Sequence, residues 1–492
     1  MQVTESEETR SGDRRALWYV ASVAAAALSW WLMRDHDPAQ RAVGAVFPFA
    51  VVLYVSEALP LAVTALLSVV LLILLGGATP DSAFAAFGDK IILLFIGSFI
   101  LAKGMERTGL DIRLSYLILR APAFSRTPSR LLLTLGTIGC VFSVFVSNTA
   151  VAAMMMPIAI SLIRRFRLKR GDPFATALPL MLAWGASVSV SMMIATPPNL
   201  IAVSLLRERL NTDISFVQWS LFAMPVSVLM ILATWIVIRL LFGRRPPHTE
   251  EAVTLAQKEI RALGPLSQGE RNVMIAFFLT LTLWVAPDLA DTLLGSENTV
   301  AVWLKARVHA SVAALIGACA LFLLPCREGE GSRALTWRDA AGIDWGTILL
   351  FGGGIALGKA MFDIGFAELM GGRIVDIVGV STLWGAVALC AILASLLSEH
   401  SSNTASATTM VPLAIGIAES LGVNPVPPAL AAALGSSLGF MLPISTPPNA
   451  IAYGTGMVRV KNMAKAGILL DVAGVAAILL ALRVMLPLLG MA

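Results

Sequence analysis

The sequence has 492 residues, of which 57% are hydrophobic and only 14% are charged, whereas about a quarter of the residues of an ordinary globular protein are charged. This composition excludes a string of soluble domains and predicts that most of the chain lies in lipid. The net charge of +5 could suit nucleic acid, but the basic residues occupy short connections between apolar runs, where they orient a membrane protein. We therefore expect a lipid bilayer and no nucleic acid as partner.

The chain begins with a polar segment, residues 1–15, and an apolar run at 16–33. This run is too long for the apolar region of a signal peptide and about long enough to cross a bilayer. We predict a cytoplasmic tail at 1–15 and a first spanning helix after it. Further long apolar runs lie at 60–77, 220–242, 272–287, 308–325 and 463–489. The expected fold class is an all-α polytopic membrane protein with about 11 transmembrane helices.

An internal repeat relates the two halves of the chain. ILLFIGSFILAKGMERTGL at 92–110 and ILLFGGGIALGKAMFDIGF at 348–366 are identical at nine of nineteen positions. Lys103 and Lys359 recur within the repeat, and we expect both to lie near helix ends rather than at a substrate. The pattern predicts homologous repeats at 16–242 and 272–492, separated by a cytoplasmic loop at 243–271 that contains Arg244, Arg245, Lys258, Arg261 and Arg271.

A polar triplet, Ser147, Asn148 and Thr149, stands within the apolar segment at about 129–163. If the N-terminus is cytoplasmic, the basic run at 164–170 lies on the cytoplasmic side only if this segment enters and leaves the membrane on the same side. We therefore predict a re-entrant hairpin with the triplet at its tip. Non-helical backbone at membrane depth is tolerated only where it is buried in protein or lines a wet cavity.

Two consecutive prolines follow the first hairpin, in ATPPNLIA at 195–202. Proline lacks an N–H and crowds the preceding helical turn, so paired prolines cannot lie within a continuous helix. The pattern predicts a broken transmembrane helix over about 176–204. The break frees carbonyls before Pro197 and gives the second half-helix an exposed, positively polarised N-terminus.

Both motifs recur in the second half of the chain. Ser402, Asn403 and Thr404 predict a second hairpin at about 384–420, and STPPNAIA at 445–452 predicts a second broken helix at about 427–458. The span count places the second hairpin on the opposite side of the membrane, so the repeat is inverted, as in secondary transporters. Glu399 and His400, before the second tip, have no charged counterparts, and we expect them at a solvated edge of the hairpin.

These motifs predict an anion site in which two tips and two helix breaks converge. Hydroxyls, amides and backbone N–H groups can surround a carboxylate, but neither motif contains Lys or Arg, so a cation must balance the charge. Hard oxygen ligands suit Na⁺. A hydrolase that used Ser147 or Ser402 would need a base, and no histidine accompanies both serines. Inverted repeats with broken helices favour alternating access over a channel.

Four segments make the chain resemble the divalent anion/sodium symporter family, the sodium/dicarboxylate cotransporters, over roughly residues 16–490. They are SNTA at 147 and 402, FMLPISTPPNAI at 440–451, SEALPLAVTALLS at 56–68 and MAKAGILLD at 463–471. The resemblance implies a homodimer in the plasma (inner) membrane, in which hairpins and broken helices move as an elevator. It also implies that substrate carboxylates bind Ser147, Asn148, Thr149, Thr196, Ser402, Asn403, Thr404 and Thr446.

The resemblance further implies two Na⁺ sites. One would use Ser147, Asn148 and the carbonyl of Ala195, although a glycine is common in the family at the position of Ala195. The other would use Ser402, Asn403 and the carbonyl of Ser445. The function expected is secondary active import of C4-dicarboxylates such as succinate, malate and fumarate, coupled to Na⁺, and no enzymatic activity. The alternatives are a Na⁺-independent dicarboxylate exchanger and a Na⁺-coupled transporter of citrate or sulfate.

Overall fold

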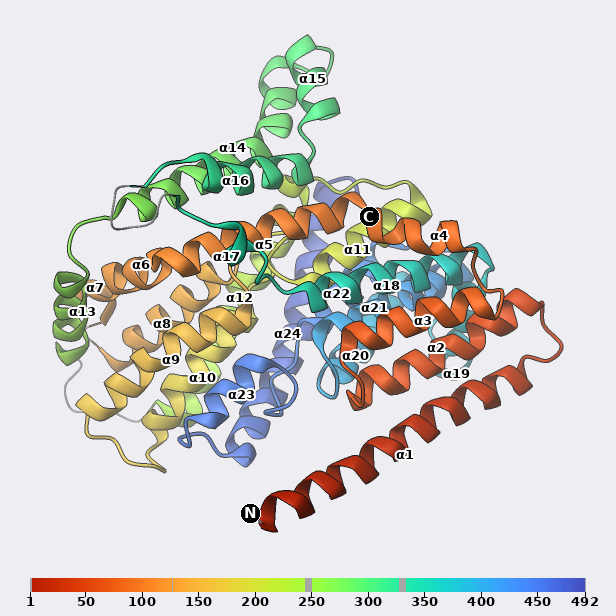
Figure 1. Cartoon of the computed structure of the whole chain (residues 1–492), viewed down its shortest axis with the longest axis horizontal. Helices are drawn as coiled ribbons and strands as arrows, with labels where there is room; N and C mark the ends of the chain where they lie inside the picture. Colours follow the sequence, from red (N-terminus) through yellow and green to blue (C-terminus); the bar gives the residue numbers. More distant parts are fainter. Residues whose placement is uncertain (1, 126, 244–249, 327–332, 492) are drawn as a thin grey trace.

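A computed structural model describes residues 2–125, 127–243, 250–326 and 333–491, which form helices and one isolated bridge between Pro325 and Arg333 (Figure 1). The predicted all-α class is confirmed. The helices are α1 (Gln2–Leu32), α2 (Pro38–Ser56), α3 (Leu61–Leu74), α4 (Pro80–Ala85), η1 (Ala86–Gly88), α5 (Lys90–Thr108), α6 (Leu110–Leu119), α7 (Pro122–Ser125), α8 (Pro128–Phe142), α9 (Asn148–Arg165), α10 (Pro173–Ser187), α11 (Pro197–Leu210), α12 (Phe216–Phe242), α13 (Glu250–Leu263), α14 (Gln268–Leu294), α15 (Thr299–Arg307), α16 (Ala310–Leu323), α17 (Trp337–Ala340), α18 (Trp345–Asp363), α19 (Phe366–Val378), α20 (Leu383–Ser398), α21 (Asn403–Ser420), α22 (Val426–Ser436), α23 (Pro447–Gly454) and α24 (Val460–Leu488).

Six helical segments in the described part of the chain are long and apolar enough to cross a membrane. They are α2, the segment from α4 to α5, α12, α14, α18 and α24. The total rises to eight if the bent pairs α15–α16 and α19–α20 each count as one span. The expected number of about 11 is not confirmed, because the hairpins and broken helices consist of shorter helices.

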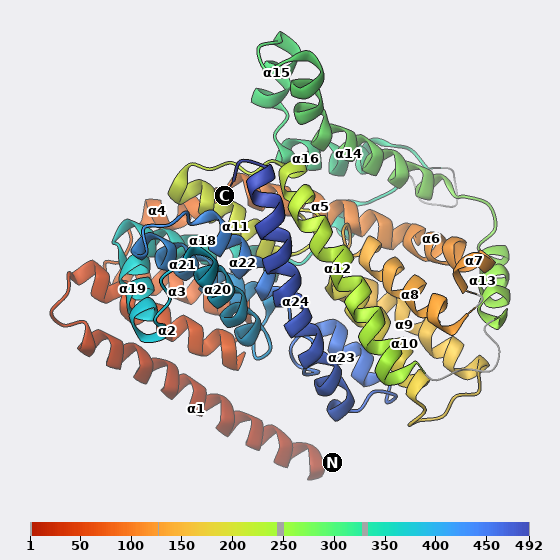
Figure 2. The same ribbon diagram turned by 180° about the vertical axis from the view of Figure 1, so that it is seen from behind.

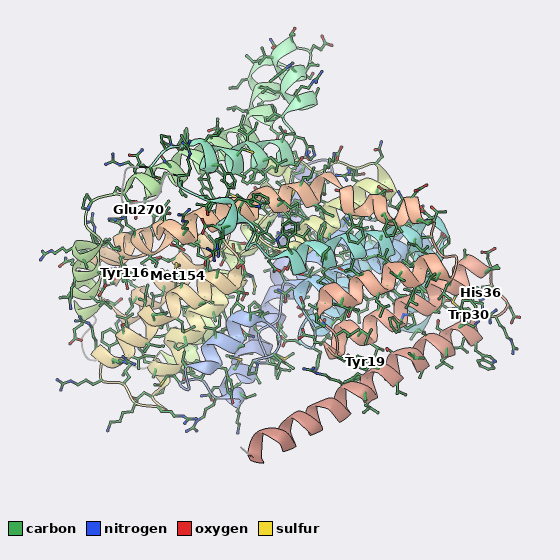
Figure 3. All side chains as sticks on the ribbon, viewed as in Figure 1. Tyr19, Trp30, His36, Tyr116, Met154 and Glu270 are labelled. Carbon is green, nitrogen blue, oxygen red and sulfur yellow. The ribbon has the colours of Figure 1, made fainter. Side chains whose placement is uncertain are left out.

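The N-terminal helix α1 is continuous from Gln2, so the predicted polar tail forms its first turns. It is not among the six apolar segments. It lies along the edge of the molecule beside α2 (Figure 1). The Tyr19 hydroxyl donates to the Ala58 carbonyl at 3.1 Å, and the Arg41 guanidinium lies 4.3 Å from the centre of the Trp30 ring. Figure 3 labels both aromatic residues on α1.

The sequence repeat corresponds to equivalent packing of α5 and α18. A Cβ atom at Gly97 would lie 2.7 Å from Ala314 of α16, and one at Gly353 would lie 2.7 Å from Ala65 of α3. Each repeated glycine therefore allows its helix to approach a neighbouring backbone. Gly109 and Gly365, which end the repeat, both have a positive φ, of 70° and 69°. This left-handed conformation explains why glycine occurs at both positions.

Each predicted hairpin consists of two helices joined by a short turn at the polar triplet. The first comprises α8 and α9, and both helices pack on α10. The second comprises α20 and α21, and both pack on α22. Each predicted broken helix likewise consists of two helices, α10 with α11 and α22 with α23. Figure 2 shows α23 and α10 close together, and the two helices are in contact.

The segment 243–271, predicted to be a loop, contains the surface helix α13 and the start of α14. Arg244 and Arg245 lie outside the described residues. The side chains of Ala252, Leu255 and Ala256 are buried, and α13 packs on α6. Arg113 of α6 pairs with Glu270 at 2.6 Å and donates to the Gly264 carbonyl at 2.7 Å. This buried arginine fixes the turn between α13 and α14, near the labelled Glu270 in Figure 3.

Candidate functional site

Both hairpin tips and both helix breaks line one cavity of about 860 Å³. The cavity therefore brings together every residue that the sequence predicted to bind substrate or Na⁺. Those residues are Ser147, Asn148, Thr149, Ala195, Thr196, Ser402, Asn403, Thr404, Ser445 and Thr446. Their convergence agrees with the predicted position of the site. Whether they bind these ligands stays a prediction.

The first tip is set by the N-terminus of α9. The Ser147 hydroxyl caps this helix by accepting a hydrogen bond from the Ala150 N–H at 3.2 Å. The Asn148 Oδ1 atom is buried and has no hydrogen-bond partner among the described residues. A buried amide oxygen without a partner is costly unless something else satisfies it. In a cavity-lining residue, this oxygen is available to a cation or to a bound hydroxyl group.

The second tip differs from the first in its hydrogen bonds. The Ser398 hydroxyl lies 2.9 Å from Asn403 Oδ1 and 2.7 Å from the Ser436 carbonyl. A hydroxyl carries one hydrogen, so it donates to one of these acceptors at a time. Ser402 precedes α21 without a side-chain capping bond. The amide oxygen of Asn403 therefore has a possible donor in Ser398, whereas that of Asn148 has none among the described residues.

The two helix breaks have nearly the same backbone conformation. Thr196 has φ −141° and ψ 146°, and Thr446 has φ −145° and ψ 148°. Both are extended because the proline that follows disfavours the helical conformation of the preceding residue. The Thr196 and Ser437 hydroxyls are 3.4 Å apart, which joins the two breaks directly.

Two buried residues that the sequence analysis did not single out, Asn199 and Asn449, hold the breaks in shape. The Asn199 amide donates to the carbonyls of Val190 and Met192, at 3.4 and 3.0 Å. The Asn449 amide donates to the carbonyls of Gly439 and Leu442, at 3.0 and 2.9 Å. Both are the asparagine of a Thr-Pro-Pro-Asn motif, so their recurrence in the two halves was the evidence that could have found them.

The two broken helices are also linked to each other. Asn449 Oδ1 accepts a hydrogen bond from Trp184 Nε1 of α10 at 3.0 Å. The equivalent oxygen of Asn199 is buried and has no partner within the described chain. The second break is therefore the more completely hydrogen-bonded of the two.

Charged side chains at the cavity are acidic. Among its described lining residues the charged ones are Glu57 and Asp344, and none is Lys, Arg or His. Both acids are exposed, and Asp344 caps α18 by accepting from the Thr347 N–H at 3.0 Å. An anion in this cavity must be balanced by hydroxyls, helix N-termini and bound cations rather than by a basic side chain.

One expectation about the second hairpin is wrong. His400 is exposed, as expected, but the Glu399 side chain is fully buried rather than solvated. The reason is that its carboxylate accepts hydrogen bonds from backbone N–H groups at the second break. Lys103 and Lys359 lie away from the cavity lining, where they pair with Glu106 and Glu208.

A family model for the sodium:sulfate symporter transmembrane region matches residues 17–492. The chain belongs to the divalent anion/sodium symporter family. It is therefore a multi-pass membrane protein from a family of transporters.

The sodium-dependent dicarboxylate transporter SdcS of Staphylococcus saprophyticus is 31% identical over 459 residues, which cover 90% of this chain and 86% of that relative. SdcS of Staphylococcus aureus is 30% identical over 450 residues, covering 88% and 84%. The solved structure of the YdaH transporter of Alcanivorax borkumensis has a similar fold, with a TM-score of 0.55 at 12% identity, covering 83% of this chain and 88% of that one.

Proposed function

We propose that this protein is a secondary active transporter that imports C4-dicarboxylates such as succinate, malate and fumarate, coupled to Na⁺. The observation that carries the proposal is the single cavity in which two polar tips and two helix breaks meet. The relatives described as sodium-dependent dicarboxylate transporters support it. We further propose that the protein is a homodimer in the plasma membrane with its N-terminus in the cytoplasm.

Two Na⁺ ions would bind where each tip meets its own break. The first would use Ser147, Asn148 and the carbonyl of Ala195. The unpartnered Oδ1 of Asn148 supports this assignment, because a hard oxygen atom without a donor suits an alkali cation. The second would use Ser402, Asn403 and the carbonyl of Ser445, all of which line the same cavity.

The substrate would lie between the two Na⁺ ions. A C4-dicarboxylate carries one carboxylate at each end, which fits a pseudo-symmetric site with one triplet in each half. The hydroxyls of Thr149 and Thr404, with those of Thr196 and Thr446, would donate to these carboxylates. Because no basic residue lines the described cavity, the bound Na⁺ ions would balance the substrate's charge.

Alternating access would require the hairpins and broken helices to move relative to α5 and α18. Ion pairs join the end of α11 to these helices: Arg207 pairs with Asp89 at 2.5 Å, and Lys359 pairs with Glu208. Asp89 is the N-cap of α5, and Asp344 is the equivalent N-cap of α18. Unlike Asp89, Asp344 lines the cavity. The ion pairs would therefore close one side in this state and would break during an elevator movement.

Uptake of radiolabelled succinate into proteoliposomes tests the proposal. An inward Na⁺ gradient should drive accumulation, and replacement of Na⁺ by K⁺ or choline should abolish it. Counterflow that persists without Na⁺ would identify the Na⁺-independent exchanger instead. Na⁺-driven uptake of radiolabelled citrate or sulfate, without uptake of succinate, would assign a different anion.

A further inference from the structure

The buried carboxylate of Glu399 connects the second hairpin to the second helix break. It accepts hydrogen bonds from the Phe440 N–H at 2.6 Å and the Met441 N–H at 3.0 Å. The Ser445 hydroxyl lies 2.5 Å from Glu399 Oε2 and 3.0 Å from the Glu399 carbonyl. Phe440, Met441 and Ser445 all belong to the segment between α22 and α23. One side chain from the hairpin thus orients the backbone that leads to Ser445 and Thr446.

The bonding pattern assigns the charge of this side chain. Two backbone N–H groups of the second break donate to it, and such donors stabilise the ionised form of a carboxyl group. No ion pair in the described chain involves Glu399. Asp471 approaches Glu399 and the Phe440 N–H from α24, but its buried oxygens make no hydrogen bond of normal geometry in the described chain. Of these two neighbouring carboxyl groups, Glu399 is the one whose negative charge is stabilised by donors.

The first half of the chain has no equivalent charge. Ser147 and Ser402 align, so Val144 occupies the position of Glu399. The first break is held by neutral groups instead: the Val190 N–H donates to the Ser227 hydroxyl at 3.0 Å, and Trp219 Nε1 donates to the Val190 carbonyl at 3.1 Å. The two halves of an otherwise pseudo-symmetric site therefore differ by one buried negative charge.

On the basis of the Na⁺ sites proposed above, we propose that Glu399 is a positioning residue that makes the second Na⁺ site the tighter of the two. It orients Ser445, whose carbonyl is a ligand of that site, and it lies three and four positions before Ser402 and Asn403, in the turn that joins α20 to α21. Its charge also attracts the cation directly. Because opposite charges a few ångströms apart in a protein attract strongly even after screening by water, we expect about a 10-fold to 100-fold effect on Na⁺ affinity.

The second site should therefore fill first as the Na⁺ concentration rises. Filling the first site, which lacks the charge, should need more Na⁺ and should be helped by the dicarboxylate. The sodium dependence of binding should accordingly show two phases. Only the phase at low Na⁺ concentration should depend on Glu399.

Na⁺ titrations of the purified full chain, followed by thermal shift in choline-balanced buffer, test this assignment. In Glu399→Gln, the half-saturating Na⁺ concentration without substrate should rise at least 10-fold. The half-saturating succinate concentration, measured at saturating Na⁺, should change less than about threefold. A merely structural defect would weaken both. Glu399→Asp, which keeps the charge, should recover part of the Na⁺ affinity.

Asp471→Asn is the matched control, because it makes the same change from carboxyl to amide beside Glu399 at a residue whose oxygens make no hydrogen bond of normal geometry in the described chain. Its Na⁺ response should stay within about threefold of the wild type. An unchanged half-saturating Na⁺ concentration in Glu399→Gln, or an equal rise in Asp471→Asn, would overturn the assignment. If Glu399→Gln does not fold, Ser445→Ala provides the second test: it loses the hydroxyl contact, keeps the carbonyl, and should weaken the low-Na⁺ phase. Unchanged Na⁺ affinity in Ser445→Ala would then overturn the assignment.

The outcome for the wild type separates this assignment from the proposed function. A wild-type protein that shows no stabilisation by Na⁺ would overturn both. A wild-type protein that responds to Na⁺ and to succinate, with Glu399→Gln behaving identically, would overturn only the role of Glu399.

Discussion

Asn449→Ala should destabilise the second helix break and reduce transport. The wild-type side chain makes three hydrogen bonds, to the carbonyls of Gly439 and Leu442 and from Trp184 Nε1, and all three groups lose their partner in the variant. A hydrogen bond contributes about 0.5–1.5 kcal/mol, toward the lower end within membranes. We therefore expect the free energy of unfolding to fall by about 2–3 kcal/mol.

Asn199→Ala should have a smaller effect on stability. Its side chain makes two hydrogen bonds, one of them long at 3.4 Å, and its Oδ1 atom has no partner within the described chain. We expect a loss of about 1–2 kcal/mol. Asn449→Ala should be the more destabilising of the two variants, because only Asn449 makes a hydrogen bond with Trp184.

Thermal unfolding in detergent, together with Na⁺-driven succinate uptake, measures both effects. Asn424→Ala is the matched control. Asn424 lies just before α22 and away from the cavity lining, where it accepts a hydrogen bond from the Val426 N–H and donates one to the Met491 carbonyl. Uptake should survive in this control and fall in both break variants. A wild-type melting temperature for Asn449→Ala, or a larger loss in Asn199→Ala, would refute the reasoning.

Three further predictions concern the site and its movement. Asn148→Ala and Asn403→Ala should each abolish uptake in a folded protein, because each removes an amide at a tip; wild-type uptake in either would show that the tips are not the site. Succinate should stabilise the protein against heating only when Na⁺ is present, with a coupling of about 1–3 kcal/mol, because the described cavity lining has no basic residue to balance a dianion. Equal stabilisation in choline buffer would favour the exchanger. Lys359→Gln should break the ion pair with Glu208 and shift the conformational equilibrium away from the present state. The accessibility of cysteines in the cavity from each side of the membrane would measure that shift. Unchanged accessibility would show that the ion pair does not bias the equilibrium.

The sequence by itself determined the parts of the site whose chemistry is local. Paired prolines cannot lie in the interior of a continuous helix, and a Ser-Asn-Thr triplet in an apolar segment must lie in a polar or hydrogen-bonded setting. The recurrence of both motifs predicted that the two halves contribute equivalent groups. The cavity that unites residues from Ser147 to Thr446 agrees with that prediction.

Only the tertiary structure decided which distant groups satisfy one another. Glu399 resembled a solvated residue at a hairpin edge because its partners, Phe440 and Met441, are 41 and 42 positions away. Asn449 meets Trp184 across 265 positions. Within the predicted loop at 243–271, Glu250–Leu263 forms α13, which packs on α6, and Arg113 of α6 donates to the Gly264 carbonyl in the turn that follows. Local sequence patterns indicate which polar groups need a hydrogen-bond partner, whereas tertiary packing determines which distant residue is that partner.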